Sequence, residues 1–329
     1  MPAYNVAPYL TEAVESLLNQ TFEDFELWII DDGSTDTTRD VIKSFLDTRI
    51  KRFFSDENRG IVIVVNEFVK KINSEFFTVT GADDISHPKR LQLQIELLRN
   101  DQELMMCGTS YAAVTEKGFM FRELRLPTDY IEVYKKMPLQ CQFLGGTTIM
   151  RSSLIDDFPE FYRLYFKDNI ADSDLASRIV DRFKAINLAP SLYYYRIVRT
   201  SLSRKNVTVR FLNLYKVVAF LSAQRRSSGE DSLMKSEPEK VDKFLVEISK
   251  EYMDDPSFVF RHTAFTHLYW KVLDGAWRNA FKALQTNPFH GKNYFLFVYL
   301  AVKSGYYFFS DRFFRMHYTE HFIKPLSMS

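Results

Sequence analysis

Three clusters of acidic residues stand where the chain pattern predicts that strands end. They are Asp31-Asp32-Gly33-Ser34-Thr35-Asp36, then Gly81-Ala82-Asp83-Asp84, and then Ala171-Asp172-Ser173-Asp174-Leu175. In an open parallel sheet, ligands bind beyond the carboxyl ends of the strands. Carboxylates at that edge can hydrogen-bond a base or a ribose, or hold a divalent cation against phosphates. Each cluster alone could equally be a turn followed by a helix start, but their repetition at successive strand ends favours a ligand site.

The elements that must position these clusters alternate between helix and strand. Short apolar runs at Leu27–Ile30 and Phe76–Thr80 end at aspartates and predict buried parallel strands, and residues 50–54 predict another. Apolar residues at helical spacing predict helices over residues 7–18, 41–46, 61–72 and 88–98. This rhythm predicts a parallel sheet with helices on its faces.

The second half of the chain has a mixed and then a helical pattern. Residues 105–114 and 119–124 flank a turn at Glu116-Lys117-Gly118 and predict a hairpin. Residues 207–221, the segment around Phe244, and residues 265–277 and 295–307 predict helices. We therefore expect an α/β domain over residues 1–204 and a helical extension over residues 205–329.

Composition excludes several classes of protein. The 329 residues include 43 basic and 42 acidic residues, a formal charge of +1, which argues against a nucleic-acid partner bound through net charge. Two cysteines, Cys107 and Cys141, exclude a disulfide scaffold and a four-cysteine zinc site. Neither a signal peptide nor a run of 18 apolar residues is visible. We expect a cytoplasmic protein, with peripheral contact at the inner face of the cell membrane as the alternative.

The acidic clusters belong to a series of short motifs that resembles family 2 glycosyltransferases of the GT-A fold. The motifs keep the family's order and approximate spacing over about the first 205 residues. They are Pro2-Ala3-Tyr4-Asn5, Leu17-Leu18-Asn19-Gln20-Thr21-Phe22, Ile30 to Asp36, Asn58-Arg59-Gly60, Asn66, Ala82 to Ser86 with Pro88, Arg90 and Leu91, Asp172 to Leu175, and Tyr195-Arg196 with Ser201. The resemblance implies a Rossmann-like α/β fold with a C-terminal helical extension. It also implies an enzyme that moves a sugar from a nucleotide donor, a UDP-sugar in the first instance, to a saccharide hydroxyl in surface-polysaccharide synthesis.

The resemblance implies roles for individual residues. Asp32 matches the aspartate that reads the base, with Asp31 as the alternative, and Asp172 matches the general base. Of Asp83 and Asp84, one would touch the ribose and the other would hold Mn²⁺ or Mg²⁺ on the diphosphate; we favour Asp84 for the metal. The complete set implied for nucleotide-sugar binding is Ala3, Tyr4, Asn5, Asp31, Asp32, Asn58, Arg59, Gly60, Asn66 and Asp83.

The chemistry of such a transfer calls for these residue types. The nucleoside diphosphate leaves with developing negative charge, which a bound divalent cation offsets. The acceptor hydroxyl is a poor nucleophile, so a carboxylate base within hydrogen-bond reach accelerates its attack. One displacement assisted by one base inverts the anomeric centre.

Several positions depart from the family pattern. Gly81 stands where the family often has an acidic residue, and Val198 stands where many members have a metal-binding histidine. Ala171 replaces the usual glutamate before Asp172, which makes Asp174 an alternative base. These departures keep a degenerate, binding-only homologue open as an alternative function. A nucleotidyltransferase is the nearest enzyme alternative, although residues 31–36 lack the basic phosphate loop that it would usually show.

Two further segments bear on the acceptor. Gly145, Gly146 and Thr147 align with the acceptor side of the family, where glycines would let the backbone approach a sugar closely; a loop before a strand is the alternative. The last 40 residues hold 12 Phe or Tyr with interleaved basic residues. We expect these rings to pack within a helical subdomain. The alternative is contact with a membrane interface, which would suit a lipid-linked saccharide acceptor.

The start of the chain also departs from the family. A buried strand precedes the Pro-x-Tyr-Asn loop in the family, whereas Met1 directly precedes Pro2 here. We therefore expect that the first strand is missing. A polypeptide without it should be less stable and bind nucleotide less well than an extended one, because the neighbouring strand would expose unpaired backbone groups.

Overall fold

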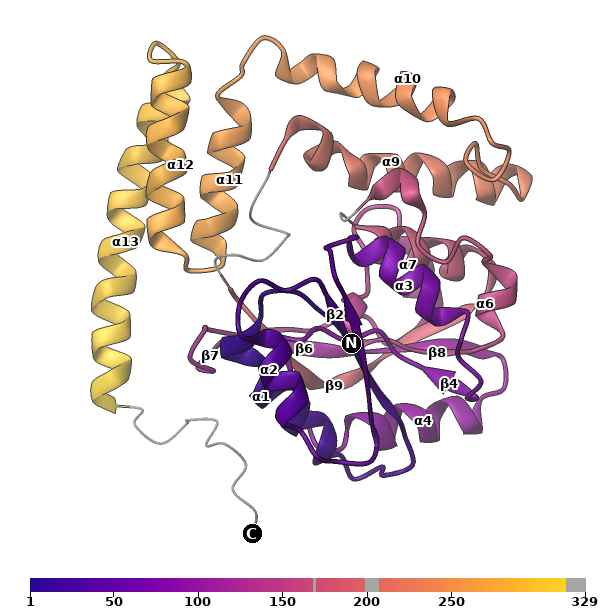
Figure 1. Ribbon diagram of the computed structural model, residues 1–329. Helices are drawn as coiled ribbons and strands as arrows, with labels where there is room; N and C mark the ends of the chain where they lie inside the picture. The colour runs from indigo at the N-terminus through magenta and orange to yellow at the C-terminus, as the bar shows by residue number, and fades with distance from the viewer. Residues whose placement is uncertain (168–169, 199–206, 318–329) are drawn as a thin grey trace. The chain divides into compact units, whose positions relative to one another are not determined.

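The computed structural model in Figure 1 describes residues 1–167, 170–198 and 207–317, with side chains up to residue 307. Contacts between Cα atoms group the chain into two compact units. The first unit contains Met1–Val198 and Tyr215–Pro238, and the second contains Arg199–Leu214 and Glu239–Ser329. The predicted domain boundary at residue 204 lies outside the described residues.

The first unit begins with three parallel strands and the helices that connect them. These elements are β1 (Pro2–Ala3), α1 (Ala7–Leu18), β2 (Leu27–Asp32), α2 (Thr38–Ser44), β3 (Ile50–Ser55) and α3 (Ile61–Val69), with strand order β1-β2-β3. Leu10, Val14 and Leu17 share one face of α1 and pack in the core around Ile29. The helical spacing seen in the sequence therefore marks the buried face. Pro2 pairs with Ile30, and the expectation about a strand before Pro2 stays a prediction.

A second, mixed sheet completes this unit. Its strands and the helices between them are β4 (Phe76–Phe77), β5 (Ile85–Ser86), α4 (Arg90–Asn100), β6 (Leu104–Val114), β7 (Met120–Leu124), α5 (Tyr130–Lys136), β8 (Ile149–Arg151), α6 (Leu154–Asp157), α7 (Ala171–Arg182) and β9 (Lys184–Arg196). The order is β4-β8-β6-β9-β5, with β7 on β6. Among the described strands of this sheet only the β6–β9 pair is parallel. The expectation that the Phe76–Thr80 run forms a parallel strand is wrong, because β4 pairs with β8 in antiparallel orientation. The β6–β7 hairpin is confirmed, and its turn places Gly118 at φ +82°.

Helices dominate the rest of the chain. They are α9 (Val209–Ser228), α10 (Pro238–Ser249), α11 (Phe258–Tyr269), α12 (Leu273–Thr286) and α13 (Gly291–His317). Helices α11, α12 and α13 lie side by side around a core that includes Ala264, Ala280 and Leu296 (Figure 1). Residues 265–277 form two helices rather than one continuous one, because Lys271 adopts φ +58° and reverses the chain. No helix within the described ranges is long and apolar enough to cross a membrane.

Candidate active site

The two aspartates that end β2 organise the neighbouring loops. The Asp32 carboxylate accepts hydrogen bonds from the backbone amides of Arg59 (3.0 Å) and Gly60 (2.9 Å). Asp31 is fully buried and accepts from the Ser34 amide (3.1 Å) and from Arg39 Nε (2.9 Å). Both residues predicted to read the base therefore stabilise neighbouring loops: Asp32 holds the loop at residues 59–60, and Asp31 holds the loop at Ser34. Any contact with a nucleotide would be additional to these bonds.

Gly33 allows these loops to approach each other. Its φ is +72°, and a Cβ atom at this position would lie 2.6 Å from the backbone nitrogen of Asn58. A side chain is therefore excluded by both backbone conformation and space. Asn58 itself is exposed on the loop that packs against Gly33.

The loop after β1 is fastened to the loop after β2. Asn5 Oδ1 accepts from the backbone amides of Thr35 (2.8 Å) and Asp36 (3.2 Å), and the Asn5 amide donates to Ser34 Oγ (3.0 Å). Ala3 is buried, whereas Tyr4 is 43% exposed. The predicted Ala3-Tyr4-Asn5 segment therefore presents an exposed aromatic ring at Tyr4.

Asp83 and Asp84 differ sharply in their surroundings. Asp84 is 8% exposed, and its two carboxylate oxygens accept from the Tyr193 hydroxyl (2.8 Å) and the Arg196 backbone amide (2.7 Å). Burial, followed by the charge of Asp83, raises the pKa of Asp84 well above its ordinary value. Asp83 is half-buried, and its backbone carbonyl accepts from Arg196 Nε (2.8 Å). Asp83 is the more accessible of the two carboxylates.

The structure explains why glycine occupies position 81. A Cβ atom there would lie 2.6 Å from Asp84 Oδ2 and 3.1 Å from Asp83 Oδ1. The carboxylates fill the space that a third acidic side chain would need. The acidic motif of this chain is therefore a pair of aspartates.

Asp172 stands at the first turn of α7. Its Oδ1 accepts from the Ser173 amide (2.8 Å), and burial raises the pKa of its carboxyl above the ordinary 3.8. Burial, followed by the nearby Asp172 charge, also raises the pKa of Cys141 to about 11. A cavity of about 10 Å³ touches Asp172 and Tyr162, which is room for about one water molecule. Asp172 is thus a carboxylate in a largely apolar enclosure, with an increased affinity for a proton.

Asp174 has a different environment two residues later. It is fully buried and pairs with Arg178 Nε (2.9 Å) and Arg163 Nη1 (3.5 Å). Arg163 also binds Asp231 through two contacts of 3.0 and 3.1 Å. This ion network surrounds Asp174 and leaves its carboxylate fully buried.

Two other predicted donor-site residues are engaged within the protein. Asn66 Nδ2 donates to the Tyr162 carbonyl and its Oδ1 accepts from the Tyr162 amide, both at 2.7 Å. The Asn66 side chain is therefore bonded to the backbone of Tyr162, which lies beside Asp172. The Arg59 side chain donates to Glu67 at 2.7 Å.

Sequence reasoning missed Tyr193 as a member of the site. It stands among three consecutive tyrosines, and nothing local distinguishes the one that bonds Asp84. Its signal is only that it lies three residues before Arg196, in the strand that pairs with Ile85–Ser86. Thr147, predicted on the acceptor side, is fully buried and donates to the Leu144 carbonyl at 2.7 Å.

A divalent cation fits the Asp83–Asp84 pair only together with a ligand. No group of three His, Cys, Asp or Glu in the described part of the chain could hold a metal. Mg²⁺ sites in nucleotide-binding enzymes commonly use one or two carboxylates and complete their coordination with phosphates and water. The pair therefore suits a cation that arrives with a diphosphate.

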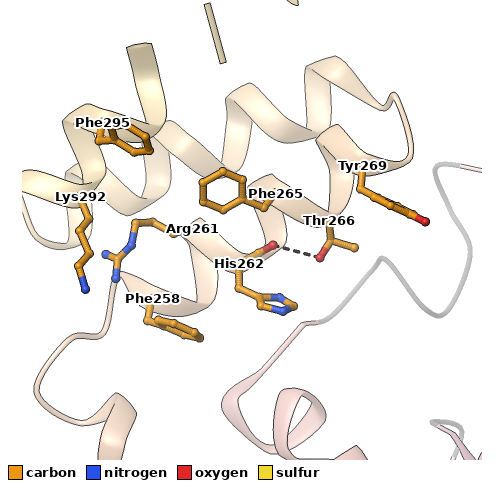
Figure 2. A pocket seen from close by; sticks show the side chains of 8 residues that line it. All are labelled: Phe258, Arg261, His262, Phe265, Thr266, Tyr269, Lys292 and Phe295. Atoms are coloured by element: carbon orange, nitrogen blue, oxygen red, sulfur yellow. Dashed lines mark hydrogen bonds between the residues drawn. The ribbon is translucent and has the colours of Figure 1, made fainter. Parts of the chain in front are cut away.

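The second unit carries an open groove of about 730 Å³ between α11 and α13 (Figure 2). Phe258, Phe265 and Phe295 contribute rings to its lining, and Lys292 lies at one end. Arg261 also lines it and is buried in bonds to Ser257 (2.6 Å) and Asn293 (2.8 Å). The lining of the groove is thus mainly aromatic, with the basic side chain of Lys292 at one end.

Comparison with known proteins relates just under half of this chain to one protein family. Residues 1–158 match the family described as glycosyl transferase family 2. The putative glycosyltransferase EpsE of Bacillus subtilis is 26% identical over 212 residues, which cover 63% of this chain and 75% of EpsE. Chondroitin synthase of Escherichia coli is 28% identical over 222 residues, covering 66% of this chain and 31% of the synthase. An uncharacterized glycosyltransferase of Rickettsia felis is 30% identical over 158 residues, 46% of this chain and 26% of that protein. This chain therefore spans less than a third of the last two relatives.

Solved structures agree on the fold. Residues 1–349 of S. aureus TarS, in complex with UDP-GlcNAc, superpose with a TM-score of 0.57 at 18% identity, covering 68% of this chain and 65% of that one. The mannosyltransferase PcManGT from Pyrobaculum calidifontis, in complex with GDP-Man and Mn²⁺, gives a TM-score of 0.51 at 15% identity, covering 92% and 78%. Residues 1–158 of the chain thus match a glycosyltransferase family 2 domain, and the structure has the GT-A fold.

Proposed function

We propose that this chain transfers a sugar from a nucleotide-sugar donor, a UDP-sugar in the first instance, to a saccharide hydroxyl with inversion at the anomeric carbon. One observation carries the proposal. Asp172 contacts Gly145, and Asp84, from a distant part of the sequence, is linked to the neighbouring Gly146 through the Tyr193 hydroxyl. A candidate base and an acidic pair connected to the same turn suit attack at a diphosphate-linked sugar.

Asp172 would act as the general base. Burial raises its pKa above 3.8, so the carboxylate has a stronger pull on the acceptor proton than an exposed aspartate has. The proton would move from the acceptor hydroxyl to a carboxylate oxygen as the hydroxyl oxygen attacks the anomeric carbon.

Asp83 would hold the cation, and Asp84, through its bonds to Tyr193 and Arg196, would keep the segment that carries Asp83 in place. This assignment reverses the preference drawn from the sequence, and it rests on the burial and double hydrogen bonding of Asp84. When bound, Mn²⁺ or Mg²⁺ would offset the charge on the departing diphosphate. The TarS structure is a complex with UDP-GlcNAc and the PcManGT structure is a complex with GDP-Man and Mn²⁺, which supports a nucleotide-sugar donor and a divalent cation here.

Nucleotide release with and without a saccharide acceptor tests the assignment of the base. Wild type, Asp172→Asn and the control Asp156→Asn should be compared; Asp156 is exposed at the start of α6. We expect transfer to fall about 10²–10⁴-fold in Asp172→Asn alone, the usual contribution of a positioned base. Binding of UDP with Mn²⁺ but no turnover in wild type would instead favour the binding-only alternative. Release of pyrophosphate from a nucleoside triphosphate would favour a nucleotidyltransferase.

A thermal-shift series tests the assignment of the metal. A ligand that binds only the folded state raises the melting temperature by mass action. We expect Mn²⁺ to increase the stabilisation that UDP gives to wild type. The Asp83→Asn variant should lose this increment while it keeps the stabilisation by UDP alone. An increment that survives in Asp83→Asn and disappears in Asp84→Asn would restore the preference drawn from the sequence.

We also propose that the helices of the second unit contact an anionic membrane surface at its cytoplasmic face. Residues 258–329 contain nine Lys or Arg against three Asp or Glu, and Phe295 is 64% exposed beside the groove. Exposed rings with basic residues suit the headgroup region of a bilayer. This location would suit a lipid-linked saccharide acceptor in surface-polysaccharide synthesis.

Vesicle flotation of the full chain tests the membrane contact. We expect binding to vesicles that contain phosphatidylglycerol and little binding to phosphatidylcholine alone. The double variant Phe265→Ser/Phe295→Ser should float less, whereas Leu139→Ser, which replaces an exposed leucine in the first unit, should float like wild type. Equal flotation of all three proteins would exclude the groove as the contact.

A further inference from the structure

We propose that the Gly145–Gly146 turn and Tyr193 are positioning residues that hold the candidate base and the candidate metal carboxylates at a fixed separation. The inference rests on the proposed function. It adds that the two glycines have separate tasks. The backbone of Gly145 fixes the position of Asp172. The backbone of Gly146 fixes the position of Tyr193, whose hydroxyl in turn holds Asp84.

The backbone of each glycine touches a different group. A Cβ atom on Gly145 would lie 2.5 Å from Asp172 Oδ2 and 3.0 Å from Asp172 Cβ. A Cβ atom on Gly146 would lie 2.8 Å from Tyr193 Cζ and closer still to the Tyr193 hydroxyl. Real Cβ atoms essentially never approach other atoms so closely, so a methyl group at either position must displace its neighbour.

The Tyr193 hydroxyl connects the Gly145–Gly146 turn with the candidate metal-binding segment through hydrogen bonds. It donates to Asp84 Oδ2 (2.8 Å) and accepts from the Gly81 backbone amide (3.2 Å), with Thr80 Oγ1 at 3.3 Å. Tyr193 is fully buried, so its ring cannot move without moving these groups. A shift at Gly146 therefore reaches both ends of the Gly81–Asp84 segment.

Helix α4 fastens the turn from its other side. Arg90 is fully buried; its Nη1 donates to the Gly146 carbonyl (3.3 Å) and its guanidinium lies 5.4 Å from the centre of the Tyr193 ring. Gln94 Nε2 donates to the Thr147 carbonyl at 2.8 Å. Within the described ranges of the chain Arg90 Nε and Nη2 have no hydrogen-bond partner, which makes this buried cation costly to keep. Its contacts with the turn and with Tyr193 are consistent with a positioning task.

The experiment compares Gly145→Ala with Gly146→Ala, the same small change at adjacent positions. Sugar transfer is measured as kcat and KM, and Mn²⁺ affinity is measured by titrating Mn²⁺ into the UDP complex. We expect Gly146→Ala to weaken Mn²⁺ binding about 10–100-fold, as changes beside metal ligands commonly do, without changing UDP binding in the absence of metal. We expect Gly145→Ala to keep Mn²⁺ and UDP binding and to lose about 10²-fold in kcat, because a small displacement of a catalytic group has that effect.

Tyr193→Phe is the second variant, because it removes the hydroxyl and keeps the buried ring. It should reproduce the weaker Mn²⁺ binding of Gly146→Ala even if an alanine variant fails to fold. Equal effects of both alanine variants on both readouts, or unchanged Mn²⁺ binding in Tyr193→Phe, would overturn the inference and leave the proposed function intact. A wild-type protein that neither binds nucleotide nor transfers sugar would overturn both.

Discussion

The strongest prediction concerns Asp172 and Asp174, two acidic residues of one helix turn with opposite expected roles. Replacing Asp174 by asparagine removes a fully buried charge that pairs with Arg178 at 2.9 Å and Arg163 at 3.5 Å. Arg163 keeps Asp231 as a partner. Among the described residues Arg178 keeps the carbonyls of residues 160 and 161 and the face of the Phe158 ring but loses its carboxylate partner, so its charge is left without an anion.

The magnitude follows from this loss of charge. Removing one partner of a buried ion pair costs about 3–5 kcal/mol. An asparagine oxygen can still accept from Arg178 Nε, which puts Asp174→Asn near the lower value, about 3 kcal/mol. For a unit of this size each kcal/mol changes the melting temperature by about 2–4 °C, so we expect a decrease of about 6–12 °C. Asp172→Asn removes a carboxylate whose charged form burial disfavours, so its melting temperature should stay near that of wild type.

Thermal unfolding and nucleotide release, measured on the same preparations, separate the two roles. Asp172→Asn should unfold like wild type and lose transfer. Asp174→Asn should unfold early and, below its unfolding transition, keep the specific activity of the folded fraction. Asp156→Asn serves as the control for an exposed aspartate. A stable but inactive Asp174→Asn beside an active Asp172→Asn would refute the reasoning and make Asp174 the base.

Three further predictions test other parts of the structure. Because the pKa of Asp172 is raised, transfer should decline as pH falls through a value above the ordinary 3.8; a kcat/KM profile whose acid limb lies at or below 3.8 would contradict this. In urea unfolding, Gly33→Ala should cost at least about 2 kcal/mol, from a strained φ and a clash with the loop at residues 57–58. Gly229→Ala, which has φ +84° and open space, should cost about 1 kcal/mol; equal losses would argue against the clash. Arg261 lowers the pKa of Asp255 to about 2, so this pair stabilises α11 above about pH 4 and loses its effect toward pH 2. Hydrogen exchange of α11 should show that dependence in wild type and a flatter one in Asp255→Asn.

Local patterns predicted many of the elements. The apolar run that ends at Asp31 forms β2, and the helical spacing from Ile61 forms α3, because in both cases the buried face follows the period of the backbone. The same reasoning overestimated the strand at Phe76–Thr80, of which only Phe76–Phe77 pairs with β8. Strand direction in the second sheet was also missed, since periodicity carries no information about which strands become neighbours.

In the candidate site, too, some properties follow from the sequence and others from the tertiary structure. By itself the sequence determined the family motifs and which acidic clusters follow strands, because these are properties of short segments. Only the tertiary structure decided which acid of each pair is accessible. Asp84 is enclosed by Tyr193, 109 residues away, and Asp174 is paired with Arg163 across a loop. Accessibility and pKa depend on such distant partners, and a motif read along the chain does not contain them.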